Sequence, residues 1–338
     1  MRYYVGLDID ADLDSQITEA VRAEDAGFDG IWSTHYYNSP FVPLAAIAGH
    51  TKRINLGSNI AYAFTRSPME TAITALDLDS LSRGRFNLGL APGFKTINER
   101  WYGVSHGRPA PHMKECIQIT RAIMEKAAAG EPVRFKGRYY DIDVQGWHRP
   151  QKRVRERVPI YVGAMREGMC RMAGDVADGL IPHSICTPKW MREVMWPNVV
   201  TGLKRSGRER KNFDFCACIS VAITRDRKQA VHDYKDTIAF SAVTKPYQTI
   251  FAWHGFEKEA AHIREMFMQG GYGPEVIDAV PDEMVEAFTV IGTADQVREK
   301  VKELEGFADS VLLAQTSYGA PSEIKDHYRD AMYQAFAR

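Results

Sequence analysis

The chain has 338 residues, of which 45% are apolar and 25% are charged, and this composition excludes disordered and fibrous proteins. Its 43 basic residues balance 43 acidic ones, and no basic stripe interleaved with aromatic residues indicates a nucleic-acid partner. No apolar run reaches the roughly twenty residues that a membrane span requires, and residues 1–8 are typical of a strand and not of a signal peptide. We therefore expect a soluble, cytoplasmic protein with a sizeable core and no membrane contact.

The first part of the chain alternates short apolar runs with amphipathic segments. An apolar run at residues 3–8 ends in a carboxylate, and a helical pattern then begins at Leu13 and closes at Gly27. The alternation continues with strands at 30–33, 54–60 and 85–90 and with helices at 68–81 and 113–129. Such strand–helix–strand units predict parallel strands joined by right-handed crossovers.

The remainder of the chain adds more strands and two irregular segments. Residues 133–140 are rich in β-branched and aromatic residues around a central Lys136-Gly137, which predicts a hairpin insertion near residues 131–146. Residues 244–286 are rich in aromatics, glycine and methionine and predict a helical insertion. The further strands are predicted at 159–163, 179–182, 213–221 and 309–313.

The predicted strands number eight, which is the number that closes a (β/α)8 barrel. We therefore expect residues 1–338 to form a single α/β TIM-barrel domain with insertions, and a doubly wound parallel sheet is the alternative. In such a barrel the functional residues lie in the loops that follow the strands, because those strand ends converge on one mouth.

Two polar residues directly after predicted strands are candidates for catalysis. His35 lies in a polar loop, where an imidazole can donate a hydrogen bond or exchange a proton near neutral pH. A loop histidine satisfied by backbone groups is the alternative interpretation. Asp8 ends the first strand, and helix capping or turn formation is its alternative role.

A third strand end resembles an anion site, whereas other chemistries lack their motifs. Residues 164–168 follow a strand and open a helix, so free backbone N–H groups and Arg166 could bind an anionic cofactor tail. A turn without ligand is the alternative. Residues 88–93 lack the lysine of a P-loop and the spacing of a dinucleotide fingerprint. There is no G-x-S-x-G elbow, no histidine pair with ligand spacing and no C-x-x-C pair among five cysteines, so we expect neither a hydrolase nor a metal site.

Three stretches of the sequence carry a resemblance to a known family. They are Ala-Glu-Asp-Ala-Gly-Phe-Asp-Gly-Ile-Trp at 23–32, Leu-Asp-Ser-Leu-Ser-Arg-Gly-Arg-Phe-Asn-Leu-Gly-Leu at 78–90, and Val-Ala-Asp-Gly at 176–179. In these stretches the chain resembles the luciferase-like flavin and deazaflavin oxidoreductases. Residues 56–68, which contain Thr-Arg-Ser-Pro, and His35 look closer to the branch that uses the deazaflavin coenzyme F420 than to the FMN monooxygenases.

The resemblance implies F420 as cofactor, with FMN as the alternative, and a homodimer. It implies a non-proline cis peptide bond between Asn59 and Ile60, in a bulge that supports the ring, and a role for His35 near the reactive centre of that ring. The cofactor-binding residues expected on this basis are Asn59, Ile60, Arg66, Gly93, Asn98, Ala164, Met165, Arg166, Glu167 and His183.

One departure from the family pattern bears on the substrate. In sugar-phosphate dehydrogenases of this branch a glutamate follows the glycine equivalent to Gly93, whereas this chain has Phe94 there. We therefore expect hydride transfer between F420 and a small, weakly polar organic substrate in contact with Tyr36, Phe94 and Trp101. The alternatives are an FMN-dependent monooxygenase with a partner reductase and a non-catalytic flavin- or deazaflavin-binding protein.

Overall fold

The computed structural model describes residues 1–315 and 320–338. These residues group into two compact units. We call the unit of Tyr4–Pro182 and Glu193–Cys216 the N-terminal unit. The C-terminal unit consists of Met1–Tyr3, His183–Arg192 and the described part of Ala217–Arg338. That the chain folds as a single domain stays a prediction.

Parallel strands form the main sheet. Their order is β11-β10-β12-β1-β2-β3-β5-β8-β9, β9 pairs in turn with β10, and the short β4 pairs with β5. Without β4 and β11, the other eight strands form the closed parallel barrel that the sequence predicts. The strands of this sheet are β1 (Arg2–Gly6), β2 (Gly30–Ser33), β3 (Asn55–Ser58), β4 (Ala61–Tyr62), β5 (Phe86–Ala91), β8 (Ile160–Gly163), β9 (Gly179–Ile181), β10 (Asp214–Ile223), β11 (Thr289–Gly292) and β12 (Ser310–Ala314).

Burial and capping explain where these elements begin and end. Every side chain of β2 and β5 is buried, as expected for parallel strands that are covered on both faces. Helix α1 follows Asp12, whose carboxylate accepts a hydrogen bond from the Ser15 N–H at 2.8 Å. Helix α3 follows Ser67, which caps it in the same way, and has Pro68 at its first position.

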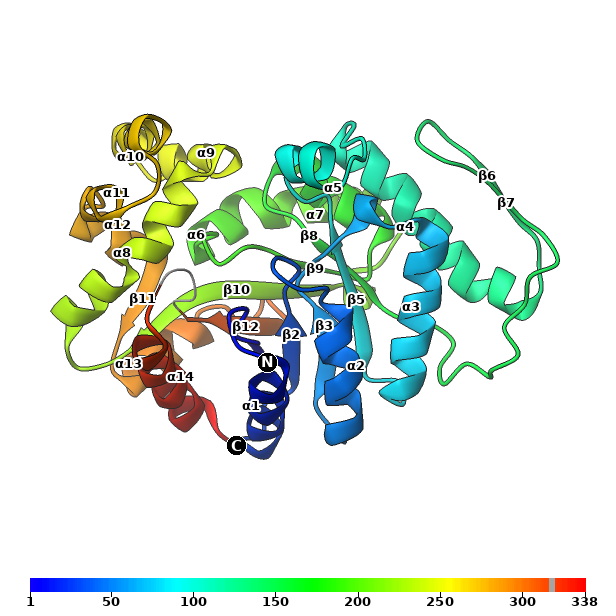
Figure 1. The fold of residues 1–338 in the computed structure, drawn as a ribbon, viewed down its shortest axis with the longest axis horizontal. Helices are drawn as coiled ribbons and strands as arrows, with labels where there is room; N and C mark the ends of the chain where they lie inside the picture. Colours follow the sequence, from blue (N-terminus) through cyan, green and yellow to red (C-terminus); the bar gives the residue numbers. More distant parts are fainter. Residues whose placement is uncertain (316–319) are drawn as a thin grey trace. The chain divides into compact units, whose positions relative to one another are not determined.

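The helices of the N-terminal unit cover the strands in chain order. Consecutive helices pack on one another, from α1 on α2 through to α4 on α5 and α5 on α7, and Figure 1 shows α2, α3 and α4 side by side outside β3 and β5. The helical segments of this unit are α1 (Leu13–Asp25), α2 (Phe41–His50), η1 (Ala63–Thr65), α3 (Pro68–Leu81), η2 (Ile97–Trp101), α4 (Pro109–Glu125), η3 (Ala127–Ala129), α5 (Glu167–Val176), α7 (Trp196–Arg205) and η5 (Arg210–Asn212). The segment η4 (Met191–Met195) spans the boundary between the two units.

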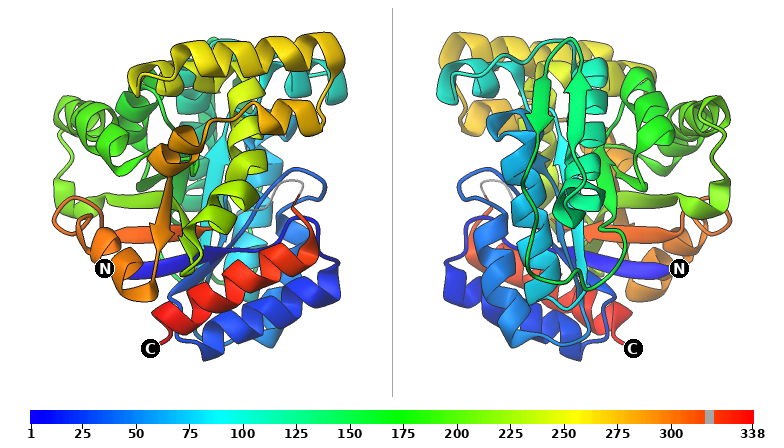
Figure 2. Two further views of the ribbon diagram at one scale, coloured as in Figure 1. Left: turned by 90° about the vertical axis from the view of Figure 1, so that its left-hand side faces the viewer. Right: turned by 90° about the vertical axis from the view of Figure 1, so that its right-hand side faces the viewer.

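An antiparallel hairpin of β6 (Val133–Lys136) and β7 (Asp141–Val144) lies along α4 (Figure 2). The sequence predicts its turn at Gly137, but the second strand starts later than that turn implies. Helix α4 holds the intervening loop, because the Glu115 carboxylate accepts hydrogen bonds from the N–H groups of residues 138–139 at 2.9 and 2.8 Å. These two N–H groups are therefore not available to a strand partner.

The C-terminal unit contains mostly helices. Residues 244–286 are largely helical, and β11 follows them in a position for which the sequence analysis gave no strand. None of the described helices is long and apolar enough to cross a membrane. The helical segments of this unit are α6 (Pro188–Trp190), α8 (Arg227–Val243), η6 (Lys245–Tyr247), α9 (Gln248–Trp253), α10 (Glu257–Gly270), α11 (Pro274–Asp278), α12 (Asp282–Phe288), α13 (Ala294–Lys302) and α14 (Ser322–Phe336).

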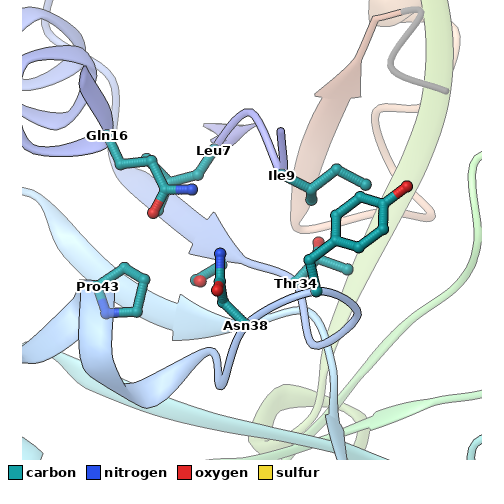
Figure 3. A pocket seen from close by; sticks show the side chains of 8 residues that line it. Leu7, Ile9, Gln16, Thr34, Asn38 and Pro43 are labelled. Carbon is teal, nitrogen blue, oxygen red and sulfur yellow. The ribbon is translucent and has the colours of Figure 1, made fainter. Parts of the chain in front are cut away.

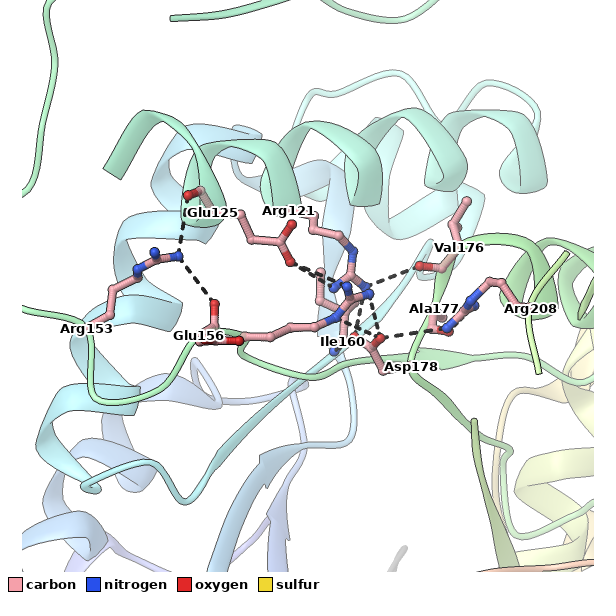
Figure 4. Close-up of polar contacts among 10 residues, drawn as sticks. Arg121, Glu125, Arg153, Glu156, Ile160, Val176, Ala177, Asp178 and Arg208 are labelled. Carbon is pink, nitrogen blue, oxygen red and sulfur yellow. Dashed lines mark hydrogen bonds and ion pairs between the residues drawn. The ribbon is translucent and has the colours of Figure 1, made fainter. Parts of the chain in front are cut away.

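A half-buried carboxylate links the amino-terminal ends of β8 and β9 (Figure 4). The Asp178 carboxylate accepts hydrogen bonds from Arg121 at 2.8 Å, from Arg157 at 2.7 Å and from the Ile160 N–H at 2.9 Å. Arg208 adds an ion pair at 3.8 Å. Burial by itself would raise the pKa of Asp178, but these partners outweigh it and hold the pKa below its ordinary value. This end of a barrel is the one associated with stability.

Candidate active site

The loop after β2 and the segment after β3 are tied together at the carboxyl ends of their strands. The peptide bond between Asn59 and Ile60 is cis, which confirms the prediction. The Asn59 carbonyl accepts a hydrogen bond from the Thr34 hydroxyl at 3.0 Å, and the Ile60 carbonyl accepts one from the His35 N–H at 3.3 Å. The bulge therefore fixes the backbone from which His35 projects.

The same bulge is supported by a close contact with β5. The Ser58 hydroxyl donates to the Gly89 carbonyl at 2.8 Å and accepts from the Gly89 N–H at 2.9 Å, so one side chain replaces both groups of a strand partner. A Cβ on Gly89 would lie 1.8 Å from the Ser58 carbonyl oxygen. Only glycine therefore permits this approach.

His35 is buried, with 4% of its surface exposed, and both of its ring nitrogens have partners. Nδ1 accepts a hydrogen bond from the Tyr62 N–H at 3.1 Å, and Nε2 lies 3.0 Å from the Tyr102 hydroxyl oxygen. The Tyr62 ring also stacks on the imidazole, with 4.3 Å between centroids. Burial and then the positive charge of Arg66 lower the pKa of His35 to about 4, so the imidazole is neutral at pH 7.

Arg66 follows the bulge and is held from two sides. Its Nη2 donates to the Ser39 hydroxyl at 3.2 Å, and its guanidinium carbon lies 5.1 Å from the centroid of the Phe41 ring. Its Nη1 is buried and has no hydrogen-bond partner within residues 1–315 and 320–338. A fixed guanidinium with one unused buried N–H group fits a ligand that presents a carbonyl or an anionic oxygen.

The loop after β5 carries two more of the predicted cofactor residues. Gly93 has a left-handed φ of 68°, and a Cβ there would meet the Tyr62 ring at 2.9 Å. The fully buried Asn98 donates through Nδ2 to the Pro92 carbonyl at 2.6 Å and to His106 Nδ1 at 2.8 Å. Its Oδ1 is consequently a buried acceptor, and no described residue donates to it.

The aromatic residues predicted to contact the substrate differ in exposure. Trp101 is 66% exposed, whereas Tyr36 and Phe94 are half-buried. Tyr36 packs edge-on against Tyr37, with 4.8 Å between ring centroids. Tyr102, directly after Trp101, is 42% exposed and is the residue whose hydroxyl meets His35.

The segment after β8 provides a helix start for the predicted cofactor tail. Ala164 is buried, Met165 is half-buried, and Arg166 and Glu167 are exposed at the beginning of α5. No side chain of the described residues caps this helix. Glu167 pairs with Arg171 at 3.6 Å, one turn along the helix. That Arg166 and the first N–H groups of α5 bind an anion stays a prediction.

Asp8 belongs to a local network at the end of β1. Its carboxylate accepts a hydrogen bond from the Asp10 N–H at 3.0 Å, its N–H donates to Glu19, and its carbonyl accepts from Gln16. A cavity of about 10 Å³ lies between the two chain neighbours of Asp8, Leu7 and Ile9, and the loop after β2 (Figure 3). This space holds roughly one water molecule and is too small for a flavin. The cavity is lined by Leu7, Ile9, Gln16, Ser33, Thr34, Tyr37, Asn38 and Pro43.

His183 follows β9 and lies in the C-terminal unit, so its surroundings are described within that unit. Its Nδ1 accepts a hydrogen bond from the Ile185 N–H at 3.2 Å, and its ring lies 4.9 Å from that of Tyr247. Burial lowers the pKa of His183 to about 4, so this imidazole is also neutral at pH 7.

The structure adds residues to the site that the sequence analysis missed. Tyr62 and Tyr102 both contact the His35 ring, and His106 holds the Asn98 amide. Their position in the chain was the one signal that could have indicated them. Tyr102 and His106 lie in the loop after β5, which also contains the predicted substrate contacts Phe94 and Trp101. Sequence alone could not show which of these side chains reaches the loop after β2.

The fold and the site define an α/β-barrel protein with a neutral imidazole and a fixed guanidinium at its strand ends. The family model described as luciferase-like monooxygenase matches residues 4–310 of the chain. The chain belongs to this luciferase-like monooxygenase family.

Individual proteins that are similar to this chain include reductases and a monooxygenase. The 5,10-methylenetetrahydromethanopterin reductase of Archaeoglobus fulgidus is 30% identical over 305 residues, which cover 88% of this chain and 88% of the reductase. The solved coenzyme F420 dependent tetrahydromethanopterin reductase from Methanopyrus kandleri has a TM-score of 0.78 at 26% identity, covering 97% of this chain and 99% of that chain. The oxygenating constituent of 3,6-diketocamphane monooxygenase from Pseudomonas putida, solved with FMN, has a TM-score of 0.65 at 17% identity and covers 100% and 96%, and this likeness shows the fold alone.

Proposed function

We propose that the chain is an F420-dependent oxidoreductase that transfers a hydride between the deazaflavin and a small, weakly polar organic substrate. The class, an F420- or flavin-dependent oxidoreductase, follows from the relatives. The choice of F420 is carried by one observation: a solved reductase described as F420 dependent covers nearly the whole chain at 26% identity. The 30% identical protein of A. fulgidus is also named as a reductase, which supports a redox enzyme.

The residues present fit such a cofactor. Arg66 Nη1 is a buried donor and Asn98 Oδ1 a buried acceptor, and neither has a hydrogen-bond partner among the described residues. A flavin or deazaflavin ring edge presents both acceptors and a donor, which are the kinds of partner that these two atoms lack. Arg166 and the start of α5 would hold the phosphate of the tail. When bound, F420 supplies or accepts a hydride.

The substrate class is inferred from the neutral imidazole of His35 and the aromatic side chains of the loops beside it. The imidazole is neutral, and the aromatic residues of the two neighbouring loops include Tyr36, Phe94, Trp101 and Tyr102. Such surfaces favour apolar contacts with a few directional hydrogen bonds. Glu99, the nearest acid along the loop after Gly93, pairs with Lys95 at 4.0 Å on the exposed side of η2.

A cofactor titration tests the proposal. Purified protein should change the fluorescence of F420 on binding, and Arg66→Met should weaken that binding about tenfold or more, because a charged hydrogen bond is worth about 1.5–3 kcal/mol. Arg53→Met, which changes an exposed arginine on the loop before β3, is the matched control and should bind F420 like the wild type. Tight binding of FMN without binding of F420 would contradict the proposal.

The second candidate function is an FMN-dependent monooxygenase with a partner reductase, favoured by the match to the family model described as luciferase-like monooxygenase. It predicts oxygen-dependent turnover with reduced FMN. A protein that binds the cofactor without turnover across alcohols, enones and imines would instead be a binding protein. The homodimer and the cytoplasmic location stay predictions, and size-exclusion chromatography with light scattering tests the first.

A further inference from the structure

The hydrogen bonds of His35 fix the position of its single proton. A backbone N–H can only donate, so Nδ1, which lies 3.1 Å from the Tyr62 nitrogen, must accept and carries no hydrogen. In the neutral ring the proton is therefore on Nε2. The Tyr102 oxygen, 3.0 Å from Nε2, then accepts that proton in a hydrogen bond.

This arrangement leaves the proton of the tyrosine free for another group. The Tyr102 hydroxyl uses its oxygen toward His35, and among the described residues it makes no other hydrogen bond. Tyr102 is 42% exposed, whereas His35 is 4% exposed. Tyr102 is therefore the more accessible of the two residues to a substrate.

His35 itself is poorly placed to exchange a proton. Its Nε2 already carries one, and a second proton on Nδ1 would place an N–H group against the Tyr62 N–H. That arrangement would break the hydrogen bond and bury a charge beside Arg66, whose positive charge already disfavours the protonated ring. The imidazole is built to donate one hydrogen bond and to remain neutral.

We propose that Tyr102 is the catalytic residue that exchanges the proton with the substrate, and that His35 is a positioning residue that orients Tyr102. This proposal rests on the proposed function and assigns its proton step. It also names the substrate class as one in which a carbon bonded to oxygen or nitrogen changes between C=X and CH–XH.

In the reducing direction the Tyr102 O–H bond breaks and its proton passes to the substrate heteroatom. The electron pair of the C=X π bond forms the new X–H bond, while the substrate carbon receives the hydride from the reduced cofactor of the proposed function. The tyrosine oxygen keeps the O–H electron pair as a phenolate, which the His35 Nε2–H stabilises by a charge-assisted hydrogen bond. Solvent returns the proton, because the side chain is partly exposed. The oxidising direction reverses each step.

The first arm of the test measures the tautomer without any cofactor. Nitrogen-15 NMR of the histidine-labelled protein at pH 7 should show His35 protonated at Nε2 and bare at Nδ1. Tyr102→Phe should shift the His35 Nε2–H resonance, because its acceptor is removed, and should keep the same tautomer. A proton found on Nδ1 would overturn the proposal whatever cofactor the protein uses.

The second arm measures turnover with whichever of F420 and FMN the wild-type protein binds, using alcohols, ketones and imines. Tyr102→Phe should lower kcat by about 10²–10⁴-fold and leave the dissociation constant of the cofactor within twofold. Tyr272→Phe makes the same chemical change at a tyrosine of the C-terminal unit that is 40% exposed, and it should leave kcat unchanged. His35→Gln, which keeps a side-chain N–H donor, should retain more activity than His35→Ala if the residue positions the tyrosine.

The outcomes separate the two proposals. Unchanged kcat in Tyr102→Phe overturns the role of the tyrosine while F420 binding by the same protein upholds the proposed function. Wild-type protein that binds FMN in place of F420 contradicts the proposed function, and the loss of kcat in Tyr102→Phe would still support the proton step. Wild-type protein that binds neither cofactor overturns both.

Discussion

Acid should destabilise this protein through His35 before most of its carboxylates are protonated. The ring is held neutral by burial, by the positive charge of Arg66 and by the hydrogen bonds from Tyr62 and to Tyr102, and its pKa falls from 6.5 to about 4. Between these pH values the unfolded chain binds a proton that the folded chain does not. The free energy of unfolding therefore falls as the pH falls, by about 3 kcal/mol in all and by about 2 kcal/mol between pH 7.5 and pH 5.

The assay compares urea unfolding of the wild type and of His35→Asn at pH 7.5 and pH 5. Asparagine can place an oxygen near the position of Nδ1 and cannot take up a proton, so the stability of the variant should depend less steeply on pH, by about 2 kcal/mol over this range. His262→Asn removes an exposed histidine of α10 and should retain the wild-type slope. Parallel profiles for the wild type and His35→Asn would refute the argument that the fold keeps this imidazole neutral.

Three further substitutions test the packing and the charges of the barrel and of the site. Asp178→Asn removes the carboxylate shared by several arginines and should lower the free energy of unfolding by about 3–5 kcal/mol in urea titrations, and a loss below about 1 kcal/mol would contradict a structural role. Gly89→Ala should cost at least about 2 kcal/mol by the same assay, because the new Cβ would lie 1.8 Å from the Ser58 carbonyl oxygen. Gly49→Ala is its control, since a Cβ there meets nothing within 4 Å and should be neutral or stabilising by up to about 1 kcal/mol. Arg66→Met should raise the pKa of His35 in an NMR titration, and an unchanged pKa would show that this charge does not reach the ring.

The strands of the barrel could be predicted because local signals agreed with burial. The predicted range of β2 is the observed one, and α3 begins where Ser67 and Pro68 indicate. Strand β11 was missed because it follows α12 without a break, so its four residues continue the apolar pattern of a helix. The second hairpin strand was misplaced for a different reason, since the loop before it is fixed by Glu115 on α4.

The site residues likewise include some that a local sequence signal indicates and one that depends on a contact between distant positions. His35 and Arg66 could be proposed because each follows a strand end or a recognisable stretch of sequence. Tyr102 could not, because its contact with His35 joins positions 67 residues apart and depends on how two neighbouring loops meet above their strands. Trp101 and Tyr102 are adjacent in the sequence, and no local pattern shows which of the two rings contacts the imidazole.

Arg66 and His35 should be considered as one electrostatic unit. The positive charge of Arg66 lowers the pKa of His35, so anything that neutralises the guanidinium must raise that pKa by removing the same repulsion. A ligand that brings negative charge to Arg66 Nη1 is therefore coupled to the protonation of His35, and by reciprocity protonation of His35 would favour that ligand. At neutral pH the remaining burial still keeps the ring neutral, with its proton on Nε2. The tyrosine then keeps its orienting hydrogen bond in the free and in the liganded protein, so the charge on Arg66 can serve ligand binding without changing the proton donor.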